Sequence, residues 1–354
     1  MAALPGGRQV TVHGVHGAAT EVGTAGGYRS IVEFDASVVA EYRQRAEPYI
    51  DMWRDAAPSW LDELELDPAP PYNRMGTHSL MFEDWFQIDE RQEYERSLRL
   101  RLVDERRDDV FAVLPTAEDA AIEVFELVLG WATARGLIGP STVIGGGRHP
   151  LVEAGLLVQD DLCIMNQRDG HWRLDGAFVC FPSVWRLHEK LGLGMAAIHQ
   201  PIGHHDELES RIVRFFDRMR VGNPVWRRNM SLKPTHALFL PISKAMMTSD
   251  TLSATLSAAL SATVPIGEDG SPYWIRSERQ TLTKLPRTGA ILFAIRTQIA
   301  PVSVLLRRPD IAEGIVTMYE SWDEEMMAFK MADPNVRTSL LPWLRTVATG
   351  KPMS

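Results

Sequence analysis

The sequence predicts an α+β fold in which helices flank an antiparallel sheet. Two β-hairpins are expected, because β-prone residues surround turn-forming residues at Asp169-Gly170 and again near residues 286–289. An amphipathic helix is expected between them, since four apolar residues recur at helical spacing: Leu208, Ile212, Phe215 and Met219. Hairpin, helix and hairpin in this order are typical of a domain built on an antiparallel sheet.

The order of elements is also compatible with a PAS-like sheet. We expect four parts in the chain: a flexible Gly/Ala/Thr-rich arm at residues 1–30, a helical region at 31–140, a PAS-like core at 150–305, whose bounds follow from a family resemblance described below, and a helical tail at 306–354. Helices are expected over residues 37–60, 91–107 and 116–136, the last with a capping box at Thr116 and Asp119, and a short one over 184–191.

Composition excludes several classes of protein. No stretch approaches the ~20 consecutive apolar residues of a membrane helix, and no secretion signal opens the chain, so we expect a cytoplasmic protein without a membrane partner. Cys163 and Cys180 are the two cysteines, too few for a disulfide framework or a four-cysteine cluster, and we expect both to be buried. The net charge of −9 argues against nucleic acid as a partner.

Basic residues are concentrated in two stretches of this acidic chain. Residues 211–233 carry seven Lys/Arg against one acid, Asp217, and residues 273–308 carry seven against one acid, Glu278. Such stretches indicate a local anion, or else a solvated basic face that serves solubility or a partner.

The arginines of these stretches are candidates for binding a carboxylate, because a guanidinium presents a fork of donors that matches it. They are Arg227, Arg228, Arg276 and Arg279. Their alternative role is ordinary surface charge. A period of two places Arg276 and Glu278 on one face of their strand and Arg279 on the other. Glu278 could pair with an arginine or receive a cationic amine.

A lone imidazole, His199, lies in an apolar segment just before Gln200 and Pro201. It could be a metal or haem ligand, or a hydrogen-bonded core residue. His204 and His205 follow, but they lack the i, i+4 spacing of a helical zinc pair.

Several long phrases, in order, resemble one family: DLCIM, HWRLDGAFVCFPSVWRLHEKLG, AIHQP, RFFDRMR, PVWRRN, RSERQTL and LPRTGAILFAIRT. Over residues 150–305 the chain is similar to the haem subunit of the haem-dependent oxidative N-demethylases, the dimethylamine monooxygenase type. It differs from the family at Met230, where tryptophan is expected.

The resemblance implies a PAS-like domain with haem b that uses O₂ to demethylate a small secondary amine and release formaldehyde. It implies reductase or ferredoxin-type partner subunits, whose flavin and iron–sulfur centres supply electrons. His199 would be the axial ligand of the iron. Glu278, the lone acid of its basic stretch and on the strand face of Arg276, is predicted from its position to be the catalytic carboxylate. The remaining cofactor contacts would be Arg227, Arg228, Asn229, Arg276 and Arg279, with the arginines on the propionates.

Two other functions stay open. The first is a haem-based gas sensor or haem carrier without turnover, although the tail after Arg308 shows neither a heptad nor an enzyme motif. The second is a structural or anion-binding module without haem, which a visible spectrum separates from the others.

The axial-ligand assignment is testable by His199→Ala. Expressed with ample haem, the variant should lose haem content and show a shifted ferric Soret band, because the iron loses its protein ligand. An unchanged Soret band with full haem content would make the assignment wrong, and His204 and His205 would be tested next.

Overall fold

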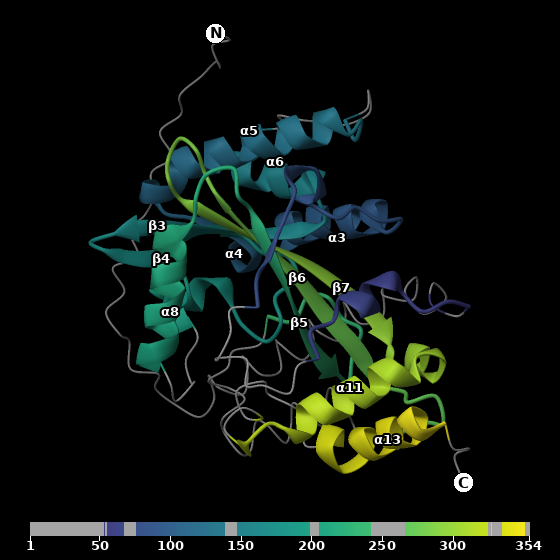
Figure 1. Cartoon of the computed structure of the whole chain (residues 1–354). Coiled ribbons are helices and arrows are strands. Elements are labelled where there is room, and N and C mark those ends of the chain that lie inside the picture. The colour runs from purple at the N-terminus through teal and green to yellow at the C-terminus, as the bar shows by residue number, and fades with distance from the viewer. Residues whose placement is uncertain are drawn as a thin grey trace, which may run out of the picture.

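The described part of the chain forms one seven-stranded antiparallel sheet with helices around it (Figure 1). The computed structural model describes residues 53, 55–66, 76–138, 147–198, 205–241, 266–324, 327 and 335–350, with the backbone alone at 196 and 205–209. The arm at residues 1–30, most of the predicted helix at 37–60, and His199 and His204 lie outside these ranges. The predicted α+β class is confirmed, and the PAS-like type stays a prediction.

The strand order is β1-β5-β6-β7-β3-β4-β2. The strands are β1 (His78–Ser79), β2 (Phe111–Val113), β3 (Asp160–Arg168), β4 (His171–Phe178), β5 (Val225–Lys233), β6 (Trp274–Lys284) and β7 (Ile291–Pro301). Both predicted hairpins are confirmed. The β3–β4 turn has positive φ at Asp169 and Gly170, and the β6–β7 turn has it at Gly289, a conformation that costs glycine little.

The α-helices are α3 (Gln92–Glu105), α4 (Arg107–Val110), α5 (Glu118–Ala134), α6 (Pro150–Leu157), α7 (Met195–Ile198), α8 (His205–Arg218), α11 (Pro309–Glu320) and α13 (Leu341–Thr349). The helices predicted over 91–107, 116–136 and around Ile212 correspond to α3, α5 and α8. Among the residues described, no helix has both the length and the apolarity needed to cross a membrane.

Two local predictions are wrong. The helix predicted over 184–191 is reduced to one 3₁₀ turn, Leu187–Glu189, because the amide of Val184 donates to the carbonyl of Leu240 and the amide of Leu240 donates to that of Pro182. These long-range bonds hold the chain where a helix would begin. The predicted capping box also fails, since the Thr116 hydroxyl donates to Asp175 instead of capping α5.

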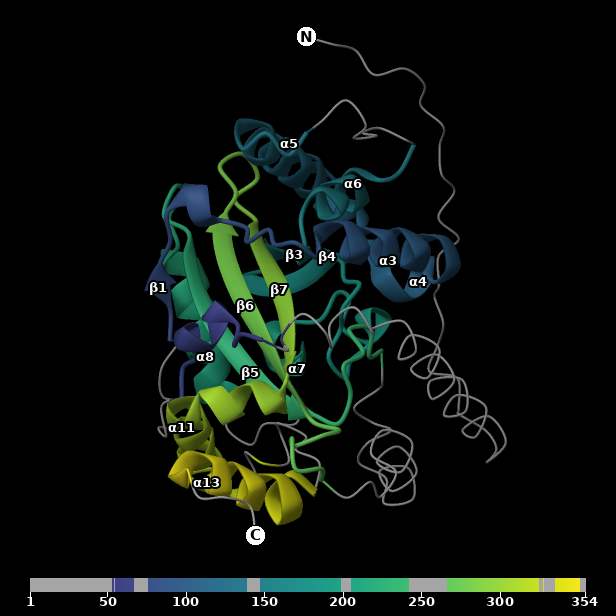
Figure 2. The same cartoon turned by 90° about the vertical axis from the view of Figure 1, so that its right-hand side faces the viewer.

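The two faces of the sheet are covered differently. We call the side that carries Glu278, Leu282 and Phe293 the pocket face, and α7 and α8 lie over it. On the opposite face, a first apolar cluster joins the sheet to α3, α5 and α6, and a second joins it to α11 and α13 (Figure 2). Cys163 and Cys180 are buried and free, as predicted, and burial raises the pKa of both thiols.

A belt of buried charge separates the two clusters of the opposite face. Strand register places four residues side by side across β5, β6, β7 and β3: Arg228, Arg279, Arg296 and Asp160. Each is at most 3% exposed. Burying an ion costs several kcal/mol unless it is paired, so this row requires partners from outside the sheet.

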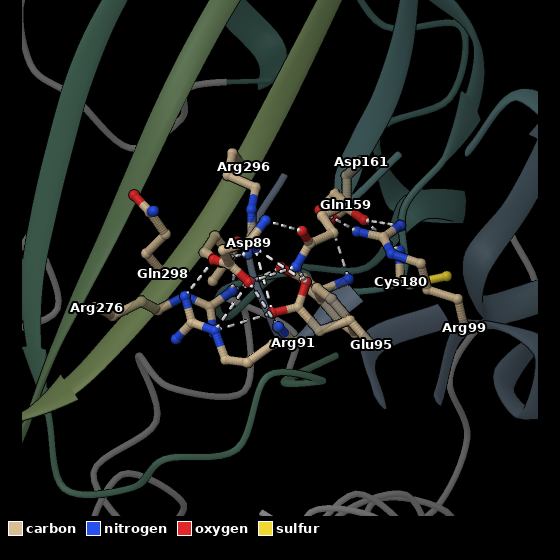
Figure 3. A network of polar contacts seen from close by, with 12 residues as sticks. Asp89, Arg91, Glu95, Arg99, Gln159, Asp161, Cys180, Arg276, Arg296 and Gln298 are labelled. Atoms are coloured by element: carbon tan, nitrogen blue, oxygen red, sulfur yellow. Dashed lines mark hydrogen bonds and ion pairs between the residues drawn. The ribbon is translucent and has the colours of Figure 1, made fainter. Parts of the chain in front are cut away.

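Arg296 receives one partner from the segment before α3 and one from the first turn of α3 (Figure 3). One guanidinium nitrogen lies 2.7 Å from Asp89 and the other 3.0 Å from Glu95. Next to this site, Arg99 of α3 lies 2.9 Å from Asp161 of β3. The carboxylate of Asp161 also accepts hydrogen bonds from the amides of Cys180 and Phe181. The network therefore fixes α3 to the sheet.

The other two arginines of the belt have different partners. Arg228 forms an ion pair with Glu63 and donates to Gln298 at 2.7 Å. Arg279 donates to the carbonyl oxygens of Asp84 and Trp85 at 2.8 and 3.1 Å. The belt thus ties down two further segments that come from the N-terminal part of the chain.

Asp160 is the unsatisfied member of the belt. It is fully buried, and neither carboxyl oxygen has a hydrogen-bond partner among the described residues. Burial raises its pKa to about 7, although Arg296 and Arg279 favour the ionised form. The folded protein therefore keeps this carboxyl protonated over a range in which an unfolded chain, with an aspartate pKa of about 4, releases the proton.

The raised pKa predicts a pH-dependent stability. Between about pH 4 and pH 7 the folded state binds more protons than the unfolded state, so Asp160 makes the free energy of unfolding fall as pH rises. Asp160→Asn cannot ionise, and its melting temperature should fall less than that of the wild type between about pH 5 and about pH 8.

The matched control is Asp310→Asn, because Asp310 is exposed and the hydrogen bond from Arg308 holds its pKa below the usual value. Asp310 is thus ionised throughout this range, and its variant should follow the wild-type slope. Equal slopes for Asp160→Asn and the wild type would contradict a buried, titrating Asp160.

Candidate functional site

A pocket lies between the pocket face of the sheet and the helices α7 and α8. Its floor is formed by apolar side chains of β3, β4, β6 and β7: Cys163, Met165, Leu174, Leu282, Phe293 and Ile295. Its walls come from the segment before α7, from α7 and from α8: Trp185, Met195, Ile198, Ile212 and Phe216. Strand alternation presents Phe293 and Ile295 to the pocket, and helical periodicity does the same for Ile212 and Phe216. The result is an apolar cavity bounded by strands and helices.

Among the described residues, four polar side chains reach this apolar cavity: Lys190, Arg227, Glu278 and Gln280. Few polar groups in a mostly apolar cavity are typical of small-molecule and cofactor sites, because apolar contact supplies binding energy while the polar groups fix orientation. The cavity is therefore the candidate site.

Glu278 is the one carboxylate among the described residues that line the pocket. Its side chain is 18% exposed and lies 3.6 Å from Nε of Arg276, and Gln280 donates to it at 3.3 Å. The predicted sharing of a strand face by Glu278 and Arg276 is confirmed. These contacts leave the carboxylate room to accept hydrogen bonds from a ligand that enters the pocket.

Arg227 lies across from Gln280 on the neighbouring strand and reaches the same pocket. Its Nε is buried and has no hydrogen-bond partner among the described residues. Burial lowers the pKa of this guanidinium, and the charges of Glu65 and Glu278 act in the opposite direction. A buried guanidinium with an unsatisfied donor is suited to bind an anion.

Arg276 shares the pocket face but is already occupied by the protein. Its guanidinium donates to the carbonyl oxygens of Phe181 at 2.6 Å and Leu238 at 3.2 Å, which fixes the segments after β4 and β5. Burial lowers the pKa of this side chain, and Glu278 raises it. Arg276 therefore supports the wall of the pocket. Of its guanidinium nitrogens, Nε is the one that makes no hydrogen bond in the described structure.

The other two candidate arginines, Arg228 and Arg279, point to the opposite face of the sheet, where they belong to the charge belt. The structure thus divides the four arginines between two faces. Asn229 is paired with Glu278 in register and lies on the pocket face. Met230, where the family phrase has tryptophan, is buried on the opposite face, away from the pocket.

The chain reaches His199 directly from the pocket wall. Ile198 lines the pocket, and its carbonyl oxygen accepts a hydrogen bond from Lys190 Nζ at 2.6 Å. Residues 199–204 follow, outside the described ranges, so the role of His199 stays a prediction.

In the parts of the chain that are described, no three His, Cys, Asp or Glu side chains are grouped to hold a metal ion. A haem iron needs a single protein ligand, so this does not bear on His199.

Sequence patterns did not identify two residues of the pocket, Trp185 and Lys190. Lys190 Nζ lies 5.2 Å from the centre of the Trp185 ring, a cation–π geometry, while also bonding to Ile198. Both residues fall in the stretch for which a helix was predicted, and no local spacing distinguishes them from surface residues. Their position at the pocket follows from the long-range bonds between residues 182–184 and Leu240.

Residues 138–339 match the family described as haem-dependent oxidative N-demethylase, alpha subunit-like. The matched range covers more than half of the chain. It includes β3 to β7, α7 and α8, which together form the pocket.

The adjacent residues Arg227 and Arg228 provide a direct test of the division between the two faces. Arg227→Met should leave the melting temperature near that of the wild type. It should weaken haem binding about tenfold to a hundredfold, because a hydrogen bond to a charged group contributes about 1.5–3 kcal/mol. Arg227→Lys should lie in between, since lysine lacks the forked geometry.

Arg228→Met should do the reverse, losing about 1–3 kcal/mol of stability because Gln298 and Ser277 lose their buried partner. The measurements are haem titration by absorbance and thermal unfolding of the haem-free protein. Equal effects of the two variants on both quantities would contradict the assignment.

Proposed function

The chain belongs to the family of haem-dependent oxidative N-demethylase alpha-subunit-like proteins, and from this premise we propose that it is the haem-binding subunit of a monooxygenase. Its substrate would be a small secondary amine such as dimethylamine, demethylated with O₂ to release formaldehyde. The observation that supports this most is the presence of Glu278 and an unsatisfied Arg227 together at the edge of an apolar pocket.

The pocket has the chemistry that haem b requires. A porphyrin is a flat apolar body with two carboxylates, and the pocket offers apolar surfaces on the sheet and on α8 together with the free donor of Arg227. His199, the next residue after the pocket-lining Ile198, would be the axial ligand. When bound, haem supplies the activation of O₂ and the one-electron chemistry, while the protein supplies position and electrostatics.

Glu278 would act on the amine. Secondary amines are protonated near neutral pH, and a carboxylate in an apolar pocket attracts an alkylammonium more strongly than it would in water, because the effective dielectric constant is lower. A hydrogen bond from the ammonium to the carboxylate would fix the nitrogen and so direct one methyl group into the pocket. The apolar side chains of Ile212 and Phe216 would exclude water from that methyl group.

Glu278 can also move a proton in the last step. Hydroxylation of the methyl carbon gives a carbinolamine, which splits into formaldehyde and the shortened amine when the hydroxyl proton is removed and the nitrogen is protonated. A carboxylate within reach of both atoms can accept the first proton and return one to nitrogen, which is general acid–base catalysis. The splitting of the carbinolamine conserves atoms and charge and needs no further reactant.

The electrons would come from other proteins. Both cysteines are buried thiols in β3 and just after β4, and the sequence carries neither an iron–sulfur motif nor a dinucleotide fingerprint. We therefore propose reductase or ferredoxin-type partner subunits that carry flavin and iron–sulfur centres. The description of the family as an alpha subunit supports an assembly of several subunits.

A Soret spectrum followed by single-turnover assays tests this function. Ferrous protein mixed with O₂, dimethylamine and a source of the second electron, such as a reduced ferredoxin, should release formaldehyde in proportion to haem, because hydroxylation consumes two electrons and a ferrous haem supplies one. A haem spectrum without formaldehyde from any small secondary amine would favour the gas sensor or haem carrier instead.

Glu278→Gln tests the role of the carboxylate. The variant is isosteric and should retain haem, but it should lose most amine-dependent oxygen consumption and formaldehyde release, because the neutral amide no longer attracts the ammonium or accepts a proton. If Glu278 instead served to pair Arg276, the variant would lose on the order of 3–5 kcal/mol of stability and also lose haem.

The matched control is Glu63→Gln, which removes a carboxylate that pairs with Arg228 on the opposite face. It should lower the melting temperature, because Arg228 loses its ion-pair partner, and leave the formaldehyde yield per haem unchanged. A stable Glu278→Gln with wild-type formaldehyde yield would exclude Glu278 from both roles.

A further inference from the structure

Helix α8 has two faces with different chemistry. Ile212 and Phe216 point inward and line the pocket. On the outward side Arg214 and Arg218 are one turn apart and exposed. Neither guanidinium has a hydrogen-bond or ion-pair partner among the described residues, and Arg220, just past the end of the helix, is exposed in the same way. We call these three residues the α8 arginine surface.

Asp217 keeps its negative charge but forms no ion pair with these three arginines in the described structure, so they still outnumber it. Asp217 is the acid of the C-terminal half of α8, and its carboxylate accepts hydrogen bonds from Trp172 Nε1 at 2.9 Å and from Gln167 Nε2 at 3.1 Å. The β3–β4 hairpin therefore engages Asp217. The other acids of the helix, Asp206, Glu207 and Glu209, fall in its first two turns. Unpaired positive charge is thus concentrated at one end of a helix in a protein of net charge −9.

The α8 arginine surface combines positive charge with an apolar contact. Its arginines present forked donors that can bind the carboxylates of a partner protein. Val221 follows Arg220 and is 51% exposed, so an apolar contact lies beside the charges. Forked positive charge beside an exposed apolar side chain suits contact with an acidic protein surface.

The α8 arginine surface lies close to the pocket because α8 itself forms one wall of it. On one side of the pocket lie the sheet and, behind it, a second layer that includes α3, α5 and α6 (Figures 1 and 2). On the other side lies α8, and a helix is about 10 Å across. The α8 arginine surface is therefore separated from the pocket by the thickness of one helix. Electron transfer slows steeply with distance, so a donor gains most by docking at a thin wall.

We propose that the α8 arginine surface is the docking site of an electron-donor protein with an acidic contact surface. This rests on the proposed function, because it assumes that the pocket holds haem and that electrons arrive from another protein. The charges would steer the encounter, and Val221 would contribute apolar contact in the complex. One electron leaves the reduced donor and converts ferric haem to ferrous haem, with no other bond made or broken.

The test uses a purified, acidic plant-type ferredoxin as the donor probe and follows the Soret band in a stopped-flow instrument. The variant is Arg214→Glu/Arg218→Glu. Its haem reduction by ferredoxin at low ionic strength should be about tenfold to a hundredfold slower than in the wild type, and the difference should shrink as salt is added. Reduction by dithionite, a small reductant that needs no docking, should be unchanged.

The matched control is Arg107→Glu/Arg135→Glu, which changes the net charge equally at exposed sites at the start of α4 and just after α5, where neither arginine has an ion-pair partner in the described structure. It should reduce as fast as the wild type. Equal rates for the α8 variant and the wild type, or equal slowing by the control, would overturn the proposal, as would the absence of salt-dependent reduction of the wild type.

Failure of the haem proposal is distinguishable from failure of the docking proposal. A protein without a Soret band contradicts the proposed function. In that case isothermal titration of the full chain with ferredoxin still tests the surface, and binding that does not depend on Arg214 and Arg218 overturns the docking site.

Discussion

The ion pairs of Arg296 with Asp89 and Glu95 are the constraint on which the rest of the structure depends. Arg296 lies in the middle of β7, fully buried, where an unpaired guanidinium would cost several kcal/mol. Burial opposes ionisation of Asp89, yet Arg296 and Arg91 outweigh it and hold the pKa of this carboxyl below its usual value. Asp89 is therefore ionised at neutral pH and forms a charged pair with Arg296. To form this pair, the segment that leads into α3 must lie against the sheet.

This constraint separates the two faces of the sheet by function. The opposite face contains the charge belt between two apolar clusters, and its arginines are occupied by the protein. The pocket face can then be largely apolar, with Arg227 and Glu278 at its edge. Because side chains alternate along a strand, neighbouring residues such as Arg227 and Arg228 have unrelated tasks. One faces a cavity that a ligand can enter, and the other completes the belt.

Helix α8 repeats this division at the outer wall of the pocket. Its period of 3.6 residues places Ile212 and Phe216 inward and Arg214 and Arg218 outward. A single helix can thus close an apolar cavity and present a charged surface to another protein. The Asp217 carboxylate accepts hydrogen bonds from Trp172 and Gln167 of the β3–β4 hairpin, and it forms no ion pair with the arginines of that surface in the described structure. The substrate, cofactor and electron donor that we propose would in this way approach the same small volume from different directions.

The sequence by itself determined the elements whose signals are local. The two hairpins, the helices α3, α5 and α8, the burial of both cysteines and the shared strand face of Arg276 and Glu278 follow from turn residues and from periods of 2 and 3.6. The phrases that resemble the N-demethylase family were likewise readable in the sequence, and the family match over residues 138–339 confirms them.

Only the tertiary structure decided which arginines face the pocket and which belong to the belt. Periodicity tells that Arg227 and Arg228 point in opposite directions, but not which direction is the cavity. The partners of Arg296 and Arg228 lie 201 and 165 residues away in the chain. The predicted helix at 184–191 failed for the same reason, because the bonds to Leu240 override local propensity. Local patterns are set by neighbouring residues, whereas the burial of a charge is decided by whichever distant segment supplies its counter-charge.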